Sequence, residues 1–351
     1  MIRMADPAAR HARVGEAVER AVIEVLRSGR YVGGPVVDTA RARLAAAFGW
    51  AYGVTTNSGT DALAYALLAL GVGPGDEVIV PAVTFFATAG AVARVGATPV
   101  VGDVRSDLPL LDASRLPLGP RTRAVIAVHL YGEPCLLPGL PVPVVDDLAQ
   151  CAGASPSPKN GTVGAVSFYP TKTLGAAGDA GLVLTDSADA ARDLLLLTNH
   201  GMPEPYLHER VCGSIGSNSR MDAVQAAVLL VHLDDLPARI ALRRATALRY
   251  DAELPIWVRR LPRHASHALH QYVVRVPNRD AVRSRLAASG VDSALFYPRS
   301  LANQPALAGF PHAPTPEADA YCAEALAIPL HECLSHNEVS QVVAAFGSHA
   351  P

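Results

Sequence analysis

The 351-residue chain lacks an excess of charge of either sign. Its 30 Lys and Arg side chains are nearly balanced by 32 Asp and Glu, so the net charge at pH 7 is -2. This balance argues against a broad nucleic-acid-binding face and gives no reason to expect a membrane surface as a partner. No apolar run is long enough to span a bilayer, and the opening "MIRMADPAARHARVG" has no apolar segment typical of a secretory signal.

Cysteine is also scarce. The five cysteines are scattered along the chain, and none forms a C-x-x-C pair. A dispersed, odd-numbered set is more typical of a reducing compartment than of a disulfide framework, so the sequence predicts a cytoplasmic protein. The 12 histidines do not combine with the cysteines at ligand spacing, and we expect no metal site.

Apolar material, in contrast, is abundant. Half of the residues are hydrophobic, which is ample for a sizeable core, and a length of 351 residues suggests one large or two ordinary domains. Short apolar runs alternate with helical patterns, and near-continuous apolar strands of this kind are typical of a parallel sheet covered on both faces. These runs are "EVIVP", "TPVVGDV", "AVIAVHLYG", "VPVVDD", "AVSFYP" and "GLVLTD". The expected fold class is α/β.

Helical periodicity dominates the segments around this pattern. The sequence predicts a helix from about Gly15 to Ser28, and a longer helical stretch from Asp222 to Leu254 that breaks at Pro237. A new strand, "HQYVVRVPN", and a helix, "RDAVRSRLAASG", follow a connection rich in proline and histidine. We therefore expect a large domain over residues 1–240 and a smaller α+β domain over residues 241–351.

Polar residues gather where the predicted strands end, which is where open α/β sheets bind ligands. Gly59-Thr60 could simply start a helix, or its N–H groups could hold a phosphate. Asp147 ends an apolar strand, where a carboxylate needs a partner, and Asp146 beside it is the competitor. Phe85 could be a core residue or a stacking platform.

Lys172 stands among small apolar residues in "SFYPTKTLGAAGDAG". It could be an ordinary solvated lysine. In a dry site its pKa would be lowered and its amine would become a nucleophile. A phosphate cradle, an aromatic face, a buried carboxylate and a nucleophilic lysine together are what pyridoxal 5'-phosphate (PLP) requires.

Five blocks, in order, resemble the DegT/StrS family of PLP-dependent sugar aminotransferases. They are "SGRYVGGP", "TNSGTDALAYALLALGVGPGDEVIVPAVTFFATA", "VVDDLAQCAGA", "SFYPTKTLGAAGDAG" and "YLHERVCGSIGSNSRMDAVQAAVL". The resemblance implies a fold-type I PLP-dependent transferase, with a mostly parallel central sheet flanked by helices.

The resemblance also implies residue roles. Lys172 would form the Schiff base and shuttle the proton, and Asp147 would pair with the pyridine nitrogen. Asn218 would reach the phosphate in the neighbouring subunit, so the active sites would be shared within a homodimer. The remaining cofactor residues would be Gln150 at the ring hydroxyl, Phe85 on the ring face, and Gly59, Thr60 and Ser167 at the phosphate.

The segments expected to meet the substrate depart from the family pattern. Thr198 replaces an arginine, Thr173 replaces an asparagine, "VVDTARARLAAAFG" lacks the usual Phe-Glu, and "YPRSLANQ" has lost a histidine. Candidate substrate residues in these and neighbouring segments are Tyr206, His208, Arg220, Arg299 and His331, with the last two expected near the pocket mouth.

The function that the resemblance implies is transfer of an amino group from glutamate or glutamine to a keto group of a nucleotide-linked deoxysugar. The product would be an amino sugar for a natural product or a surface glycan. The alternatives are a keto-cyclitol as acceptor, an aromatic-precursor synthase of the same family, and a non-catalytic accessory or sensor protein with the same fold.

Overall fold

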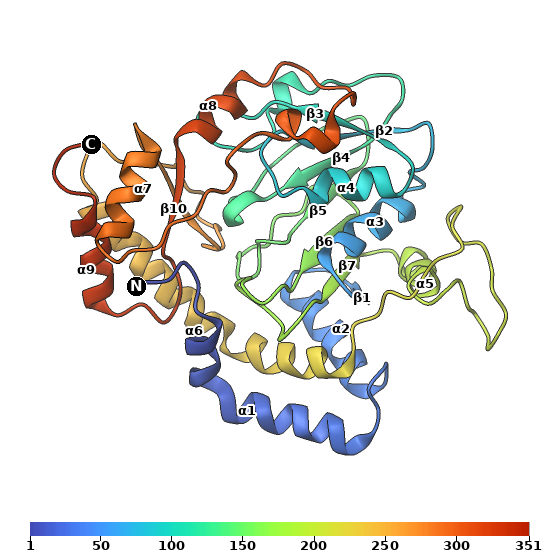
Figure 1. Cartoon of the computed structure of the whole chain (residues 1–351). Helices are drawn as coiled ribbons and strands as arrows, with labels where there is room; N and C mark the ends of the chain where they lie inside the picture. The colour runs from blue at the N-terminus through green and yellow to red at the C-terminus, as the bar shows by residue number, and fades with distance from the viewer. Residues whose placement is uncertain (351) are drawn as a thin grey trace.

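A seven-stranded sheet forms the centre of the protein in the computed structural model, which describes residues 1–350 (Figure 1). The strand order is β1-β7-β6-β5-β4-β2-β3. Strands β2 to β6 pair in parallel, whereas β7 is antiparallel to both β1 and β6. The strands are β1 (Tyr52–Thr56), β2 (Glu77–Pro81), β3 (Thr98–Gly102), β4 (Thr122–Val128), β5 (Val144–Asp147), β6 (Val163–Ser167) and β7 (Gly181–Thr185). The mostly parallel sheet confirms the predicted fold class.

Both faces of this sheet are buried. Successive strand residues point to opposite faces, and β7 shows the result: Val183 belongs to one apolar cluster, while Leu182 and Leu184 belong to another. Helix α3 packs on β6 and β7, and α2 packs on β1. The helices around the sheet are α2 (Pro35–Ala47), α3 (Gly59–Ala69), α4 (Ala87–Arg94) and α5 (Ala188–Leu197). The strands are apolar at successive positions because both faces of the sheet are buried.

Helix α1 (Pro7–Ser28) begins earlier than the predicted start at Gly15. Asp6 caps it by accepting a hydrogen bond from the backbone N–H of Ala9 at 2.9 Å, and Pro7 occupies the first turn. An acidic N-cap followed by proline is a common helix start. The first two turns thus carry Arg10 into the body of the protein, where it is 3 % exposed.

Helix α6 (Ala223–Glu253) is continuous, so the predicted break at Pro237 is wrong. Proline removes one intrahelical hydrogen bond, but residues on both sides of it are packed: Leu236 and Arg239 are both buried. In Figure 1, α6 runs from beneath the large sheet to a smaller unit at the left, with α1 alongside it. The division at residue 240 stays a prediction.

The smaller unit is built on a three-stranded antiparallel sheet, in the order β10-β9-β8. Its apolar cluster joins residues of β9, β10, α7 and α9, and it also includes Ile2 from the opposite end of the chain. The elements that follow α6 are β8 (Arg259–Arg260), β9 (Tyr272–Arg275), α7 (Arg279–Ala288), α8 (Pro316–Glu324), β10 (Ala325–Ile328) and α9 (His336–Ala345), of which α8 packs into the apolar cluster of the large sheet. Among residues 1–350, no helix is both long and apolar enough to cross a membrane.

Candidate active site

Lys172 lies on a tight loop that follows β6. The backbone N–H of Lys172 donates to the carbonyl of Tyr169 at 2.8 Å, and that of Ala176 donates to Phe168 at 2.7 Å. Gly175 allows this closure, because a Cβ at that position would lie 2.5 Å from the carbonyl oxygen of Pro170. The loop therefore has a defined shape, held by its own backbone hydrogen bonds.

The amine of Lys172 has the electrostatic setting of a nucleophile. Burial lowers its pKa, although the negative charge of Asp147 opposes that shift. The side chain keeps part of its surface exposed. Lowering the pKa increases the neutral fraction of the amine, which is the form that attacks a carbonyl carbon.

Asp147, at the end of β5, is the carboxylate whose negative charge acts on Lys172. It is 5 % exposed and receives two hydrogen bonds, from the backbone N–H of Ala149 at 3.1 Å and from Thr88 Oγ1 at 3.3 Å. Burial raises its pKa, and Lys172 partly offsets this. A carboxylate with so few donors has capacity left for a cationic ligand.

Asp146, the competitor, is fully occupied by the protein. It is completely buried, and its carboxylate lies 3.1 Å from His129 Nε2. It also accepts from the side chain of Asn160 at 2.7 Å, and from the backbone N–H groups of Asn160 and Gly161, both at 2.9 Å. The structure therefore makes Asp146 a structural residue, and Asp147 remains the candidate for the pyridine nitrogen.

Gly59 and Ser167 form a close-packed corner where α3 begins. A Cβ on Gly59 would lie 2.5 Å from Ser167 Cβ and 3.0 Å from Ser167 Oγ. Thr60 follows in the first turn of α3, and Gly59, Thr60 and Ser167 are each partly exposed. The free N–H groups of a helix start favour a phosphate, so this corner suits the phosphate of the cofactor.

Gln150 and Phe85 complete the expected ring site. The side-chain oxygen of Gln150 accepts from the backbone N–H of Tyr131, and its side chain also bonds Tyr297. Phe85 is 60 % exposed, and its ring centroid lies 6.3 Å from that of Tyr297. Burial, together with the charge of Asp147, raises the pKa of Tyr297. Tyr297 and Thr88 border the site, but the sequence did not identify them as site residues. Thr88 lies three residues after Phe85, and Tyr297 lies two residues before Arg299, so both belong to segments that already held a candidate.

Four of the predicted residues lie on the segment between α5 and α6, which extends away from the body of the molecule in Figure 1. Tyr206 is 94 % exposed. His208 bonds the carbonyl of His200 at 3.0 Å, and Arg220 donates to Asn199 Oδ1 at 2.7 Å. The fourth residue, Asn218, is exposed and pairs through its backbone with Asn199.

The two candidates from the C-terminal part differ from each other. Arg299 is exposed, as expected for a residue at a pocket mouth. His331 is 6 % exposed, and burial together with the charge of Arg243 lowers its pKa. His331 is thus as buried as Asp147 and Gln150, and its position near the mouth of the pocket stays a prediction.

Two departures from the family pattern are explained locally. Thr173 Oγ1 shares a hydrogen bond of 3.2 Å with His270 Nδ1, so the threonine links the Lys172 loop to the segment before β9. Thr198 is 3 % exposed and donates to the carbonyl of Leu195 at 3.2 Å, at the end of α5. Both side chains are used inside the fold and not at a surface.

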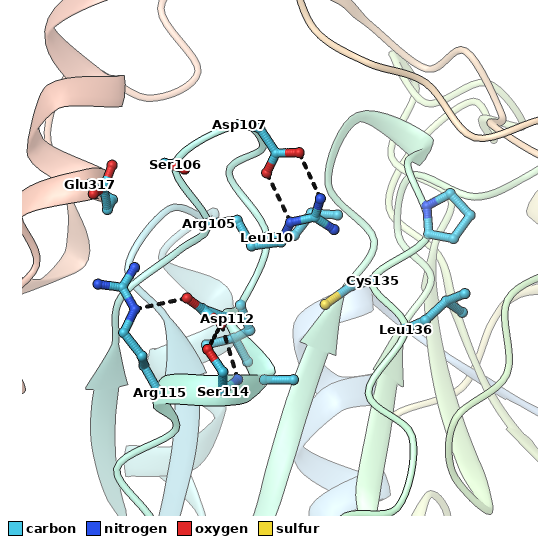
Figure 2. Close-up of a pocket in the computed structure, with 13 residues that line it drawn as sticks. Arg105, Ser106, Asp107, Leu110, Asp112, Ser114, Arg115, Cys135, Leu136 and Glu317 are labelled. Atoms are coloured by element: carbon cyan, nitrogen blue, oxygen red, sulfur yellow. Dashed lines mark hydrogen bonds and ion pairs between the residues drawn. The ribbon is translucent and has the colours of Figure 1, made fainter.

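A cavity of about 740 Å³ lies apart from these residues (Figure 2). Four of its five charged side chains are paired with each other, since Arg105 binds Asp107 and Arg115 binds Asp112, and the fifth is Glu317. None of the predicted cofactor residues lines it. This cavity is therefore separate from the predicted cofactor site.

Comparison with known proteins gives the family. The profile of the DegT/DnrJ/EryC1/StrS aminotransferases matches residues 13–347. The chain belongs to this aminotransferase family. The match confirms the resemblance drawn from the sequence blocks, and with it the predicted class of enzyme.

Three similar proteins illustrate the match. The UDP-2-acetamido-2-deoxy-3-oxo-D-glucuronate aminotransferase of Pseudomonas aeruginosa is 37% identical, covering 98% of this chain and 99% of its own. The dTDP-3-amino-3,4,6-trideoxy-alpha-D-glucose transaminase of Streptomyces venezuelae is 38% identical, covering 93% and 90%. The crystal structure of S. venezuelae DesV, in complex with a ketimine intermediate, superposes with a TM-score of 0.92 at 35% identity, covering 98% and 97%.

The cofactor of the family is PLP, and solved structures similar to this chain contain PLP or its amino form, PMP. The residues present here fit that group. The Gly59–Ser167 corner leaves no space for a side chain, Asp147 has spare accepting capacity, and Lys172 has a lowered pKa. The predicted cofactor is therefore confirmed.

Proposed function

We propose that this aminotransferase moves an amino group from glutamate or glutamine to a keto group of a nucleotide-linked deoxysugar. The observation that carries the proposal is the similarity, over nearly the whole chain, to relatives named for UDP-linked and dTDP-linked sugars. An amino sugar for a natural product or a surface glycan is the corresponding product. The five cysteines are all unpaired, which supports a cytoplasmic location.

In this proposal the chain's own residues have separate tasks. PLP, when bound, would supply an electron sink for negative charge at the substrate carbon. Lys172 anchors the cofactor and, through its amine, moves the proton of the substrate carbon that bears the amino group. Asp147 keeps the nitrogen of the pyridine ring protonated. Gln150 and Phe85 orient the ring, and Gly59, Thr60 and Ser167 hold the phosphate. Asn218 of the partner subunit completes the phosphate site, so the active unit is a homodimer.

The donor and acceptor can be tested directly. The purified enzyme with PLP is incubated with glutamate or glutamine and a panel of UDP-linked and dTDP-linked 3-keto and 4-keto sugars. We expect the 2-oxo acid and an amino sugar to form in equal amounts with at least one member of the panel. Lys172→Ala serves as the inactive control. Faster turnover of a free keto-cyclitol than of every nucleotide sugar would make the cyclitol the acceptor.

Arg299 offers a test of where the acceptor binds. Its exposed guanidinium can meet a diphosphate as a charge-assisted donor. Arg299→Ala should raise the KM for the nucleotide sugar and leave the half-reaction with the amino donor unchanged, because only acceptor binding is lost. An unchanged KM for every accepted sugar would remove Arg299 from the substrate site.

A further inference from the structure

A buried cluster of charged side chains contacts the backbone of the Lys172 loop. Its centre is Glu332, which is 5 % exposed. The carboxylate accepts from Arg10 Nε at 2.7 Å and from Arg243 Nε at 3.0 Å, and Arg239 Nε lies 3.3 Å away. The three arginines are all buried. We call these four residues the Glu332 cluster.

Arg10 joins this cluster to the Lys172 loop. While its Nε binds Glu332, its Nη1 donates to the carbonyl of Pro170 at 3.1 Å and to that of Lys172 at 3.0 Å. The planar, forked guanidinium allows these contacts at the same time. One side chain from helix α1 therefore holds the loop on both sides of Thr171.

Arg243 joins the same cluster to the C-terminal part of the chain. Its Nη1 donates to the carbonyls of Leu269, His270 and Leu330, at 3.1, 3.2 and 2.9 Å. The backbone of Lys172 is thus connected, through Arg10, Glu332 and Arg243, to the segment before β9 and to the segment after β10. The connection includes His270, whose ring meets Thr173.

Stability alone does not account for this arrangement. Burial raises the pKa of Glu332, but the attraction of Arg243, Arg10 and Arg239 outweighs it and holds the pKa well below the usual range. Well-packed apolar side chains of similar volume often stabilise a fold as well as a buried ionic cluster does. What apolar side chains cannot do is donate hydrogen bonds to the carbonyls of Pro170 and Lys172.

We propose that Arg10, held in place by Glu332, is a positioning residue for Lys172, because its guanidinium binds the carbonyls of Pro170 and Lys172. It fixes the loop from which the amine extends, and so sets the reach of the amine toward the cofactor. This inference rests on the proposed role of Lys172. A displacement of about 1 Å in a reacting group can cost on the order of 10²-fold in rate.

The first test needs no cofactor. Hydrogen–deuterium exchange is measured on the apoenzyme for backbone amides 167–176 in the wild type, Arg10→Met and Arg13→Met. Arg13 is the matched control, because it lies on the same helix and pairs with Asp235 at 3.3 Å. We expect faster exchange of the Lys172 loop in Arg10→Met only. Equal exchange in all three proteins would overturn the anchoring.

The second test uses the PLP-loaded enzyme. Arg10→Met at saturating PLP should lower kcat by about 10- to 100-fold, with less than about threefold change in the KM for the amino donor, because the substrate sites are intact. Arg13→Met should retain wild-type kcat. A wild-type kcat in Arg10→Met would overturn the proposal.

Arg10→Lys separates positioning from folding. A lysine can keep the ion pair with Glu332, but its one nitrogen cannot stand both where Nε meets Glu332 and where Nη1 meets the two carbonyls. Its urea midpoint should therefore lie closer to the wild type than that of Arg10→Met, while kcat stays low. If Arg10→Met does not fold, a wild-type kcat in Arg10→Lys overturns the proposal. Borohydride-fixable PLP in Lys172→Ala would instead contradict the role of Lys172 itself.

Discussion

A Cβ atom placed on Gly59 would lie 2.5 Å from the Cβ of Ser167. Real Cβ atoms essentially never come this close to another heavy atom, so the start of α3 can lie against the end of β6 only because residue 59 is glycine. The N–H groups at the start of α3 are thereby held next to the hydroxyl of Ser167, where the phosphate of the cofactor is proposed to bind.

Gly59→Ala should therefore weaken PLP binding. Alanine is the better helix former, but here the added methyl group must displace the backbone of Ser167, which lies 3.0 Å from its position. We expect the Kd for PLP, measured by fluorescence titration of the apoenzyme, to rise about tenfold or more, which is ~1.4 kcal/mol. Gly73→Ala is the control, since a Cβ there meets nothing within 4 Å. Equal affinities would contradict the phosphate assignment.

Asp147→Asn and Asp146→Asn should have opposite consequences. Asparagine at 147 cannot keep the ring nitrogen protonated, so kcat should fall on the order of 10³-fold while the protein stays folded. At position 146, asparagine replaces one carboxylate oxygen by an NH2 group. That group cannot accept the hydrogen bonds that Asn160 and Gly161 donate to the carboxylate of Asp146. The substitution should lower the free energy of unfolding by about 2 kcal/mol. Steady-state kinetics and urea unfolding of both variants decide the matter; normal turnover in Asp147→Asn would reject its role.

The lowered pKa of Lys172 predicts how the apoenzyme takes up PLP. The rate of cofactor attachment should rise with pH and level off with a midpoint below ~10.4, the ordinary lysine value, because burial favours the neutral amine. Asp147 raises the pKa of Lys172, so Asp147→Asn should move the midpoint to still lower pH. Stopped-flow absorbance measures both midpoints. A midpoint at the ordinary value in the wild type would contradict the dry setting of the amine.

Local patterns were sufficient for much of this site. Alternating apolar runs predicted the parallel strands, and the family blocks identified Lys172, Asp147 and Gln150 as candidates. Strand direction was less accessible, because an apolar run reads the same in either direction, and the antiparallel placement of β7 came only from the structure. The resemblance implied Asp147, but the reason Asp146 is not free for the cofactor lies in His129 and Asn160, which are 17 and 14 residues from Asp146 in sequence.

The Glu332 cluster shows where sequence reasoning ends. Arg10 and Glu332 are separated by 322 positions, and no periodic pattern relates residues so far apart. The start of α1 was accessible in principle, because Asp6-Pro7 is a helix-start signal. His331 illustrates the remaining difficulty: its position in the chain was known, but the direction of its side chain depends on how the C-terminal segment packs.

Glu332 should make stability depend on pH. Its pKa is lower in the folded chain than in the unfolded one, so its stabilising contribution is complete above ~4.3 and is lost as the pH falls toward the lower folded value. Glu332→Gln lacks that contribution and leaves three buried guanidinium groups without their anion. It should be less stable by about 3–5 kcal/mol at pH 7.

Urea unfolding at several pH values provides the measurement. The difference between the wild type and Glu332→Gln should be constant from pH 7 down to about pH 5 and should shrink below ~4.3. A difference that is independent of pH would mean that the lost contact, and not the charge of Glu332, accounts for the change. Glu338→Gln, in the exposed capping box of α9, is a control for the removal of a carboxylate from the same region.

The last prediction concerns the shared active site. Asn218 is exposed, although its backbone pairs with Asn199 and Ser219 next to it binds Asp61 in α3 at 2.6 Å. If Asn218 serves the partner subunit, Lys172→Ala and Asn218→Ala chains should each be inactive alone but should complement each other in heterodimers. Each heterodimer has one site with both residues intact, so random mixing should restore roughly a quarter of the sites, as the two-fold symmetry of a homodimer requires.

The two chains carry different affinity tags, are mixed in mild denaturant and refolded with PLP, and heterodimers isolated through both tags are assayed. Heterodimers without any activity would mean that Asn218 acts within its own chain.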